Sequence, residues 1–470
     1  MPPVIAAIIY SIGILGLFYL VRDLGSRMSK GLWVPAIWLF LICSRPPSIW
    51  LGMQGNLSGV DATQAYEEGS PFDRAVFLVL LLAALAVLIL RSEKVKRLLQ
   101  RNMPILLYFS FCAISILWSG YSFVAFKRWT KALGDVGMVL IILTEPDTLS
   151  AMKHLLTRLG FLLFPLSVLF TKYYPALGRR LTMSWTEETT GVALQKNELG
   201  LLCMIYGVFF LWMFISEYRE HGNPTRRRHL LAYGTMIAMV VWLLYQCNSM
   251  TSITGLVSAG TVTWLASRPS RKTAVVHLAV AAVLGLAITA MFFDSGGGMI
   301  EALGRNPTLT GRTQIWSMVL GLHTNPWVGT GFESFWLGPR LDYMRTALPN
   351  FPINEAHDGY LEVYLNLGWA GICLIALLLM TAYKRTISGI RRNPEKGSLF
   401  LGFLLCTLFY SFTEAGFRYM NPSWFFLLLV IVAGSISTIF NERPSRTVRN
   451  IESTIEKPAR AKEMSGLAVR

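Results

Sequence analysis

Long runs of apolar residues recur along the whole chain, and they constrain the fold more than any other feature. Each is close to the length of about 20 residues that a helix needs to cross a bilayer. Only 15% of the residues are charged, against about a quarter in a soluble domain. The pattern therefore predicts an all-α polytopic membrane protein. The clearest runs are 4–21, 75–90, 199–216, 274–293, 362–383 and 422–440.

Shorter apolar runs bring the expected number of transmembrane helices to 12 or 13. They lie at 32–43, 104–118, 132–144, 155–171, 230–246, 250–266 and 398–412. Basic clusters follow alternate runs, at 91–101, 267–272 and 383–396. Because Lys and Arg favour the cytoplasmic side, these clusters are predicted to be inside, and the segment 294–357 outside.

The same pattern divides the chain into four parts. We expect an N-terminal helix bundle at 1–293, a periplasmic loop subdomain at 294–357, C-terminal transmembrane helices at 358–440, and a disordered basic cytoplasmic tail at 441–470. The net charge of +16 could suggest nucleic-acid binding. The basic residues lie in short clusters between apolar runs, however, so the charge indicates topology and no nucleic-acid partner.

The loop at 294–357 is unusually long, and long loops are commonly functional. Its many aromatic residues predict that it folds against the outer face of the bundle. Residues 308–327 read as a helix, with Thr308 or Thr310 as N-cap and Asn325-Pro326 as its end. The predicted inward-facing side chains are Ile315, Trp316, Val319 and Leu322.

Arg312 falls in the first turn of this expected helix. The helix dipole disfavours a cation there, so the position makes sense if an anion occupies the site. Backbone N–H groups at a helix start and a guanidinium together suit a phosphate. The alternatives are that Arg312 extends into solvent or pairs with Glu301.

The glycines of VGTGFESFW, at 328–336, do not follow an expected strand and so do not indicate a dinucleotide site. We interpret them as a tight turn that brings the backbone close to a helix or a ligand.

His357 lies where the loop meets the next transmembrane helix. The helix N-terminus and a neighbouring Arg would lower its pKa, which predicts a neutral imidazole able to act as a general base. The alternative is an interfacial histidine bonded to Asp358 or Glu355. The other histidines show no ligand spacing, so we expect no metal site.

Three segments, GRTQIW (311–316), NPWVGTGFESFW (325–336) and EAHDGYLEVYLNLGWAG (355–371), follow four segments upstream. Taken in order, these segments resemble the O-antigen ligase and polysaccharide polymerase superfamily, and most of all its exopolysaccharide polymerases. The resemblance departs at Glu333 and Asp358, where Gly and Asn are expected. The first four segments in the chain are SRPPSIW (44–50), ILWSGYSFVAFKRWTK (116–131), GVALQKNELG (191–200) and NSMTSITG (248–255).

The resemblance implies a bacterial inner-membrane glycosyltransferase with a GT-C-like fold, acting on the periplasmic side without metal or other cofactor. Its substrate would be a glycan carried on undecaprenyl pyrophosphate, transferred to an acceptor glycan beside membrane lipid with inversion. A chain-length regulator and export machinery are implied as partners. Arg312 and Lys196 with Asn197 would hold the pyrophosphate, and His357 would activate or orient the acceptor hydroxyl.

Three basic residues, Lys127, Arg128 and Lys131, are placed outside against the charge rule. We interpret them either as snorkelling side chains on an interfacial helix or as a rim that attracts the anionic substrate. Arg128 is our candidate for substrate binding.

Two alternatives to a polymerase stay open. A ligase would move finished glycan onto the lipid A core. A transporter or flippase would carry ionisable residues within the membrane, for which Asp135 and Arg158 are candidates.

Overall fold

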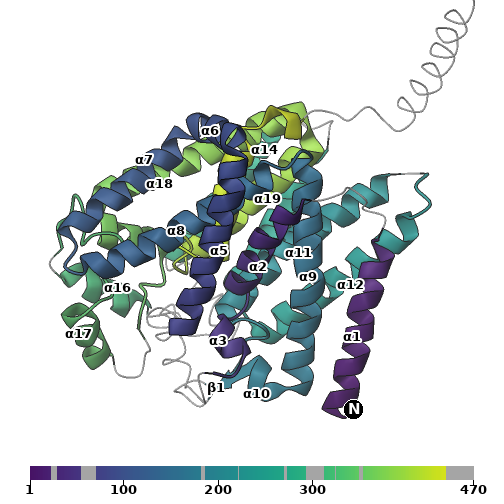
Figure 1. The fold of residues 1–470 in the computed structure, drawn as a ribbon, viewed down its shortest axis with the longest axis horizontal. Coiled ribbons are helices and arrows are strands. Elements are labelled where there is room, and N and C mark those ends of the chain that lie inside the picture. Colours follow the sequence, from purple (N-terminus) through teal and green to yellow (C-terminus); the bar gives the residue numbers. More distant parts are fainter. Residues whose placement is uncertain are drawn as a thin grey trace, which may run out of the picture.

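The structure of the protein is a computed structural model, which describes residues 1–22, 29–53, 70–181, 186–220, 222–268, 273–292, 312–322, 324–348 and 353–440. Helices dominate this part of the chain (Figure 1). The one sheet within it is an antiparallel hairpin of β1 (Arg179–Leu181) and β2 (Glu187–Thr189), with Arg180 opposite Glu188.

The helices of the first half are α1 (Pro3–Leu20), η1 (Lys30–Leu32), α2 (Trp33–Ile42), α3 (Pro47–Trp50), α5 (Pro71–Leu90), α6 (Ser92–Arg101), α7 (Met103–Ser115), η2 (Ile116–Trp118), α8 (Ser122–Leu143), α9 (Thr148–Tyr173), α10 (Pro175–Gly178) and α11 (Lys196–Arg219). Those of the second half are α12 (Arg226–Cys247), α13 (Met250–Ala266), α14 (Thr273–Phe292), α16 (Arg312–Gly321), α17 (Pro339–Ala347), α18 (Gly359–Arg392), α19 (Pro394–Ser411), α20 (Pro422–Ala433) and η5 (Ser437–Ile439).

Six helices in the described part of the chain are long and apolar enough to cross a membrane: α1, α5, α9, α11, α12 and α18. A seventh candidate is the pair α6 and α7–η2, bent by 89°. The all-α polytopic class is therefore confirmed. Each of the thirteen apolar runs overlaps a helix, but some helices are short, such as α2 with 10 residues and α20 with 12. The count of 12 or 13 spans stays a prediction.

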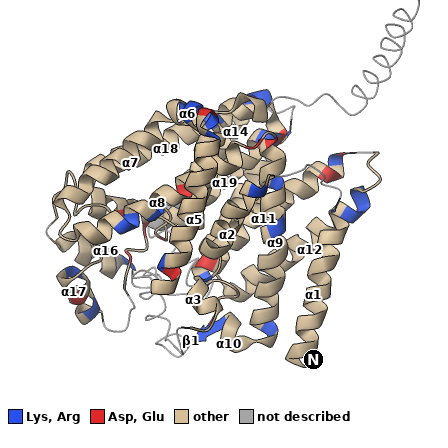
Figure 2. Ribbon diagram, in the orientation of Figure 1, with Lys and Arg blue, Asp and Glu red and all other residues tan. Residues whose placement is uncertain are grey.

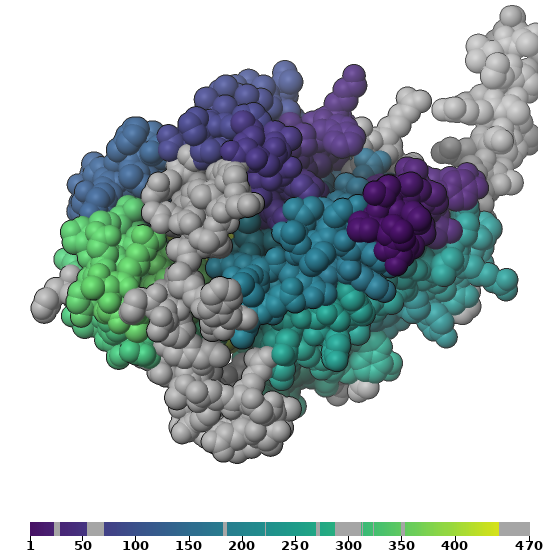
Figure 3. Space-filling view, turned by 90° about the horizontal axis from the view of Figure 1, so that it is seen from below, coloured from purple at the N-terminus to yellow at the C-terminus, as the bar shows by residue number. Residues whose placement is uncertain are grey.

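The core lies around α11 and α19. Helix α11 packs on α12, α13 and α19, while α19 also packs on α18 and α20. Large side chains such as Trp212, Tyr206 and Phe403 are fully buried there. Helix α1 lies at the rim, against α9 and α12, and appears deep purple at the edge of the molecule in Figure 3. Its exposed apolar side chains, such as Ile12, suit a surface that lipid covers.

Charged residues gather mainly toward two opposite ends of the helices (Figure 2). One end carries α6 and the end of α18, and the other carries β1, α10 and α17. A largely uncharged band lies between them, with α8 as an exception. This distribution fits a bundle whose middle lies in the hydrocarbon of a bilayer.

Helix α18 is two helices joined at a break, because Gly368 has φ 63° and ψ −161°. The segment 326–331 lies against this break. Its carbonyls at Pro326 and Trp327 accept from the amides of Trp369 and Ala370, at 2.9 and 3.0 Å. The amide of Gly331 donates to the Asn366 carbonyl at 2.9 Å. These bonds satisfy the backbone groups that the break frees, as a buried interruption requires.

Candidate active site

The loop before α18 folds on its own apolar core. Ile315 and Val319 of α16 are buried with Phe335, Trp336 and side chains of α17 and α18. The Trp316 indole donates to the Ala356 carbonyl at 2.8 Å. Phe332, Phe335 and Trp336 are buried as predicted, whereas the aromatic residues Trp327 and Tyr343 are 70% and 53% exposed.

The helix expected at 308–327 is shorter than predicted. Helix α16 ends at Gly321, and Asn325 instead accepts the Trp327 amide at 2.9 Å in a local turn. The proposed end at Asn325-Pro326 was therefore wrong by four residues, because Asn325 favours a turn through its own side chain. The candidate caps Thr308 and Thr310 lie outside the described residues.

The glycines of 328–336 form the tight turn that we predicted. Gly329 and Gly331 have φ of 65° and 97°. A Cβ on Gly329 would lie 2.4 Å from the backbone of Asn366, so only glycine allows this approach to α18. In Figure 3 the green segment that contains this turn lies beside the blue segment that contains α7 and α8.

Glu414 is the centre of the candidate site. It lies in the connection between α19 and α20 and is only 4% exposed. Its Oε1 accepts from Arg312 Nη2 at 2.6 Å and from Asn197 Nδ2 at 2.7 Å. Its Oε2 lies 2.8 Å from His357 Nδ1. Three residues proposed from the sequence, far apart in the chain, thus meet on one carboxylate.

The charge of His357 differs from our prediction. Burial lowers the pKa of His357, but the carboxylates of Glu414 and Glu355, at 2.8 and 3.1 Å from Nδ1, raise it to about 10. Burial raises the pKa of Glu355, but the imidazolium outweighs it and holds that pKa at about 2. The expected neutral imidazole is therefore wrong. His357 is a cation in this structure, because Glu414 neutralises the Arg312 charge that was expected to repel it.

The backbone fixes His357 at the start of α18. The Asp358 carboxylate accepts the Leu361 amide at 2.8 Å and caps the helix. His357 itself has φ 51°, a conformation that non-glycine residues adopt at a cost. Such strain is common where a side chain must be held in one direction. The contact between His357 and Glu355 that the sequence offered as an alternative is present, and His357 also contacts Glu414.

Lys196 and Asn197 are the first residues of α11 and point to different partners. Asn197 binds Glu414, whereas Lys196 Nζ lies 2.5 Å from Glu188 of β2. The Lys196 side chain is 39% exposed. Only Asn197 of this pair joins the Glu414 cluster, and Lys196 lies next to it on the hairpin side.

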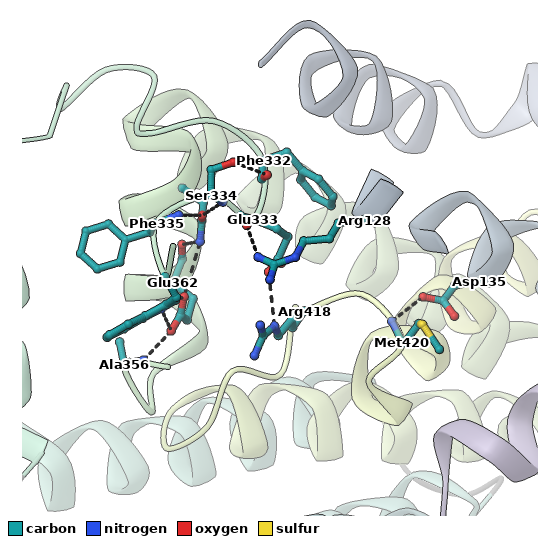
Figure 4. Close-up of polar contacts among 12 residues, drawn as sticks. Arg128, Asp135, Phe332, Glu333, Ser334, Phe335, Ala356, Glu362, Arg418 and Met420 are labelled. Carbon is teal, nitrogen blue, oxygen red and sulfur yellow. Dashed lines mark hydrogen bonds and ion pairs between the residues drawn. The ribbon is translucent and has the colours of Figure 1, made fainter. Parts of the chain in front are cut away.

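Arg128 belongs to a neighbouring cluster and not to an exposed rim. It is 4% exposed, and its guanidinium donates to the Glu333 carbonyl (Figure 4). The Glu333 carboxylate in turn accepts from Arg418 Nε at 3.3 Å. Arg128 therefore neither snorkels nor forms an exposed rim, because the turn at 328–336 covers this part of α8. Its role in substrate binding stays a prediction. Lys127 and Lys131 lie over the rings of Phe123 and Phe77.

Arg418 brings the two clusters together. It lies four residues after Glu414, and its charge helps to lower the pKa of Glu355. A small cavity of about 20 Å³ lies beside it, with Glu333, Glu362 and Asn366 in its lining. This is room for about one water molecule. The site is thus a partly buried set of positive and negative groups around the buried Glu414.

Glu355, His357 and Glu414 could also supply three metal ligands, because their ligand atoms lie within 4.8 Å of one another. A metal would have to compete with Arg312 and Asn197 for Glu414, and with the proton on His357. The two cations already balance the two carboxylates in this arrangement.

The sequence segments that carry the family resemblance meet around this site. Arg45 of the first segment donates to the Gly191 carbonyl of the third at 2.9 Å. Ser119 and Ser334 share a hydrogen bond of 2.7 Å between the second and sixth. Thr413, next to Glu414, donates to Thr251 of the fourth at 3.1 Å.

The fold and this site define a multi-pass membrane protein with a buried charged centre at one end of its bundle. Comparison with known proteins shows which class it resembles. Residues 236–376 match the family described as O-Antigen ligase, which confirms the resemblance to the O-antigen ligase and polysaccharide polymerase superfamily. The family implies a membrane enzyme of the glycosyltransferase type, acting as a polysaccharide polymerase or ligase.

The chain is also similar to one particular protein, the exopolysaccharide production protein ExoQ of Rhizobium meliloti (strain 1021). The two are 25% identical over 306 residues, which cover 62% of this chain and 67% of ExoQ.

Sequence reasoning missed Glu414 and Arg418. Both lie in SFTEAGFRYMNPSW, residues 411–424, between two apolar runs. The available signal was a carboxylate and a guanidinium in a short connection of an otherwise apolar region. A charge there is costly unless it is paired, so it indicates a partner nearby.

Proposed function

We propose that this protein joins oligosaccharide repeat units carried on undecaprenyl pyrophosphate into exopolysaccharide or O-antigen, on the periplasmic face of the bacterial inner membrane. The observation that carries the proposal is the meeting of Arg312, Asn197 and His357 on Glu414. The relative whose name refers to exopolysaccharide production supports a polymerase.

The two cations are suited to the leaving group. As the acceptor hydroxyl attacks the anomeric carbon, the bond from that carbon to the pyrophosphate breaks and negative charge develops on the phosphate oxygen. Arg312 and the His357 imidazolium stabilise this charge, since fixed cations in a water-poor site act strongly. Attack from the face opposite the pyrophosphate inverts the anomeric centre, and no metal is required.

Glu414 is then suited to accept the proton of the acceptor hydroxyl. In this structure its carboxylate is held by Arg312, Asn197 and His357. An incoming pyrophosphate competes with Glu414 for Arg312, which leaves Glu414 Oε1 with Asn197 as its remaining donor and able to accept a second hydrogen bond. A general base must lie within hydrogen-bond reach of the proton that it removes. Because His357 is protonated, we propose that it stabilises the leaving group. Glu414 then accepts the proton of the acceptor hydroxyl.

The test is an assay of purified protein in lipid nanodiscs with an undecaprenyl-pyrophosphate-linked repeat unit and EDTA. The proposal predicts a ladder of longer lipid-linked glycans without any lipid A core. Transfer that occurs only when the core is added would assign the protein as a ligase. Absence of glycan transfer, with the labelled lipid moved between leaflets, would refute the enzyme and indicate a flippase.

Of the two flippase candidates, Asp135 has a structural role and Arg158 is exposed. Asp135 accepts from the Trp38 indole at 2.9 Å. It also accepts from the Met420 amide at 2.8 Å (Figure 4). It thereby holds the connection that carries Glu414 and Arg418. Arg158 of α9 is exposed on the outside of the bundle. Neither observation favours a transport path.

A further inference from the structure

The end of the bundle opposite the Glu414 site contains a second polar cavity. It has a volume of about 290 Å³ and lies between the last turns of α18 and the segment after α20. Cavities that hold small ligands begin at about 300 Å³, so a single phosphate group fits. The lining residues are Lys384, Arg385, Ser388, Gly389, Arg392, Gly434, Ser435, Ser437 and Phe440.

The lining is basic and contains no acidic residue among those described. Arg385 donates to the carbonyls of Ile431 and Arg101, both at 2.6 Å, and to the side-chain oxygen of Asn102. All three acceptors are neutral, so these bonds orient the guanidinium without cancelling its charge. Lys384 and Arg392 add two exposed cations on the same helix.

Small residues give the cavity its shape. A Cβ on Gly389 would lie 2.6 Å from the Phe440 ring, and one on Gly434 would lie 2.6 Å from Arg385 Cβ. The Ser435 hydroxyl, which donates to the Val432 carbonyl at 2.7 Å, lies in the same lining. Charge, hydroxyl groups and a recess thus occur together.

We propose that this cavity binds a phosphate-bearing anion at the membrane boundary. The part of α18 after its break, residues 369–392, is about 36 Å long at 1.5 Å per residue, enough to cross the hydrocarbon. The cavity therefore lies at the opposite boundary from His357. The preference of Lys and Arg for the cytoplasmic side accounts for basic residues here, but not for a recess that gathers three of them. Basic pockets between helices on that side suit anionic lipid headgroups.

The test uses purified full-length protein and native mass spectrometry with phosphatidylglycerol or phosphatidylethanolamine. We expect preferential retention of phosphatidylglycerol, and a loss on the order of tenfold in Lys384→Gln/Arg392→Gln, because each cation near the surface contributes to anion binding. Both side chains are exposed, so the variant should fold. The matched control Lys96→Gln/Arg391→Gln removes the same charge from exposed positions outside the lining.

A second arm distinguishes a lipid from free phosphate. Thermal unfolding in detergent is followed with inorganic phosphate against chloride at equal ionic strength. A stabilisation by phosphate that the cavity variant loses, without a lipid preference, assigns free phosphate and also supports the site. Equal phosphatidylglycerol retention and equal phosphate response in the wild type, the cavity variant and the control would overturn the proposal.

Discussion

At the scale of single residues, the charge balance around Glu414 decides what the site can do. One carboxylate with 4% exposure holds Arg312, Asn197 and His357 at 2.6, 2.7 and 2.8 Å. Buried charges persist only when they are paired, so each of these groups depends on the others. A bound substrate pyrophosphate replaces the Glu414 carboxylate as the negative partner of Arg312.

Glu414→Gln should destabilise the protein, because Arg312 and His357 lose the charge that balances them. Breaking a buried ion pair costs about 3–5 kcal/mol. We expect a clearly lower unfolding temperature in detergent. Glu187→Gln is the matched control, since Glu187 pairs with Arg179 but is 53% exposed, and exposed pairs contribute at most about 1 kcal/mol. Equal shifts in the two variants would contradict the central role of Glu414.

The contribution of His357 to stability should depend on pH. Its pKa is raised from 6.5 to about 10. A raised histidine pKa means that the charged form stabilises the fold, fully below about pH 6.5 and progressively less as the pH rises through about 10. The difference in unfolding temperature between wild type and His357→Gln should therefore shrink from pH 6.5 to pH 10. A difference that grows over this interval would indicate a neutral histidine.

At the scale of elements, the break in α18 joins the loop to the membrane bundle. Gly368 lies in the left-handed region, and the segment 326–331 supplies hydrogen bonds to both sides of the break. This junction positions the turn at Gly329 and Gly331, and through it Glu333 of the second cluster. Backbone hydrogen bonds therefore attach the loop to α18 independently of the loop's side chains.

Gly368→Ala tests this junction. Its Cβ would lie 2.3 Å from the backbone of Trp327, and φ 63° disfavours any side chain. We expect a loss of about 1–3 kcal/mol or more in unfolding free energy. Gly285→Ala in α14 is the control, because nothing lies within 4 Å of its Cβ and alanine favours a helix by about 1 kcal/mol. A Gly368→Ala protein as stable as wild type would show that the junction tolerates rearrangement.

The elements were largely predictable, and the contacts between them were not. Apolar runs such as 199–216 and 362–383 fix helices by composition alone, and α11 and α18 cover them. The partner of Arg312, in contrast, lies 102 residues away, and that of Arg128 lies 205 residues away. No local pattern encodes such pairs. The error for His357 followed directly, because its pKa depends on a carboxylate 57 residues distant.

At the scale of the whole molecule, the two polar regions lie at opposite ends of an apolar bundle. The region around Glu414 gathers residues that are far apart in the chain, namely 197, 312, 357 and 414. The division of the chain at residue 294 stays a prediction. The proposed glycan transfer requires the lipid phosphate to reach Arg312 and His357 from the membrane boundary.

The most direct test is a single-turnover measurement of glycan transfer from an undecaprenyl-pyrophosphate-linked repeat unit by wild type, Arg312→Ala and the control Arg179→Ala. Loss of a fixed group that stabilises developing charge costs about 10²–10³-fold in rate. We predict such a loss for Arg312→Ala with correct membrane insertion, and a nearly unchanged rate for Arg179→Ala, whose pair with Glu187 lies on the hairpin. Transfer by Arg312→Ala at the wild-type rate would contradict the account.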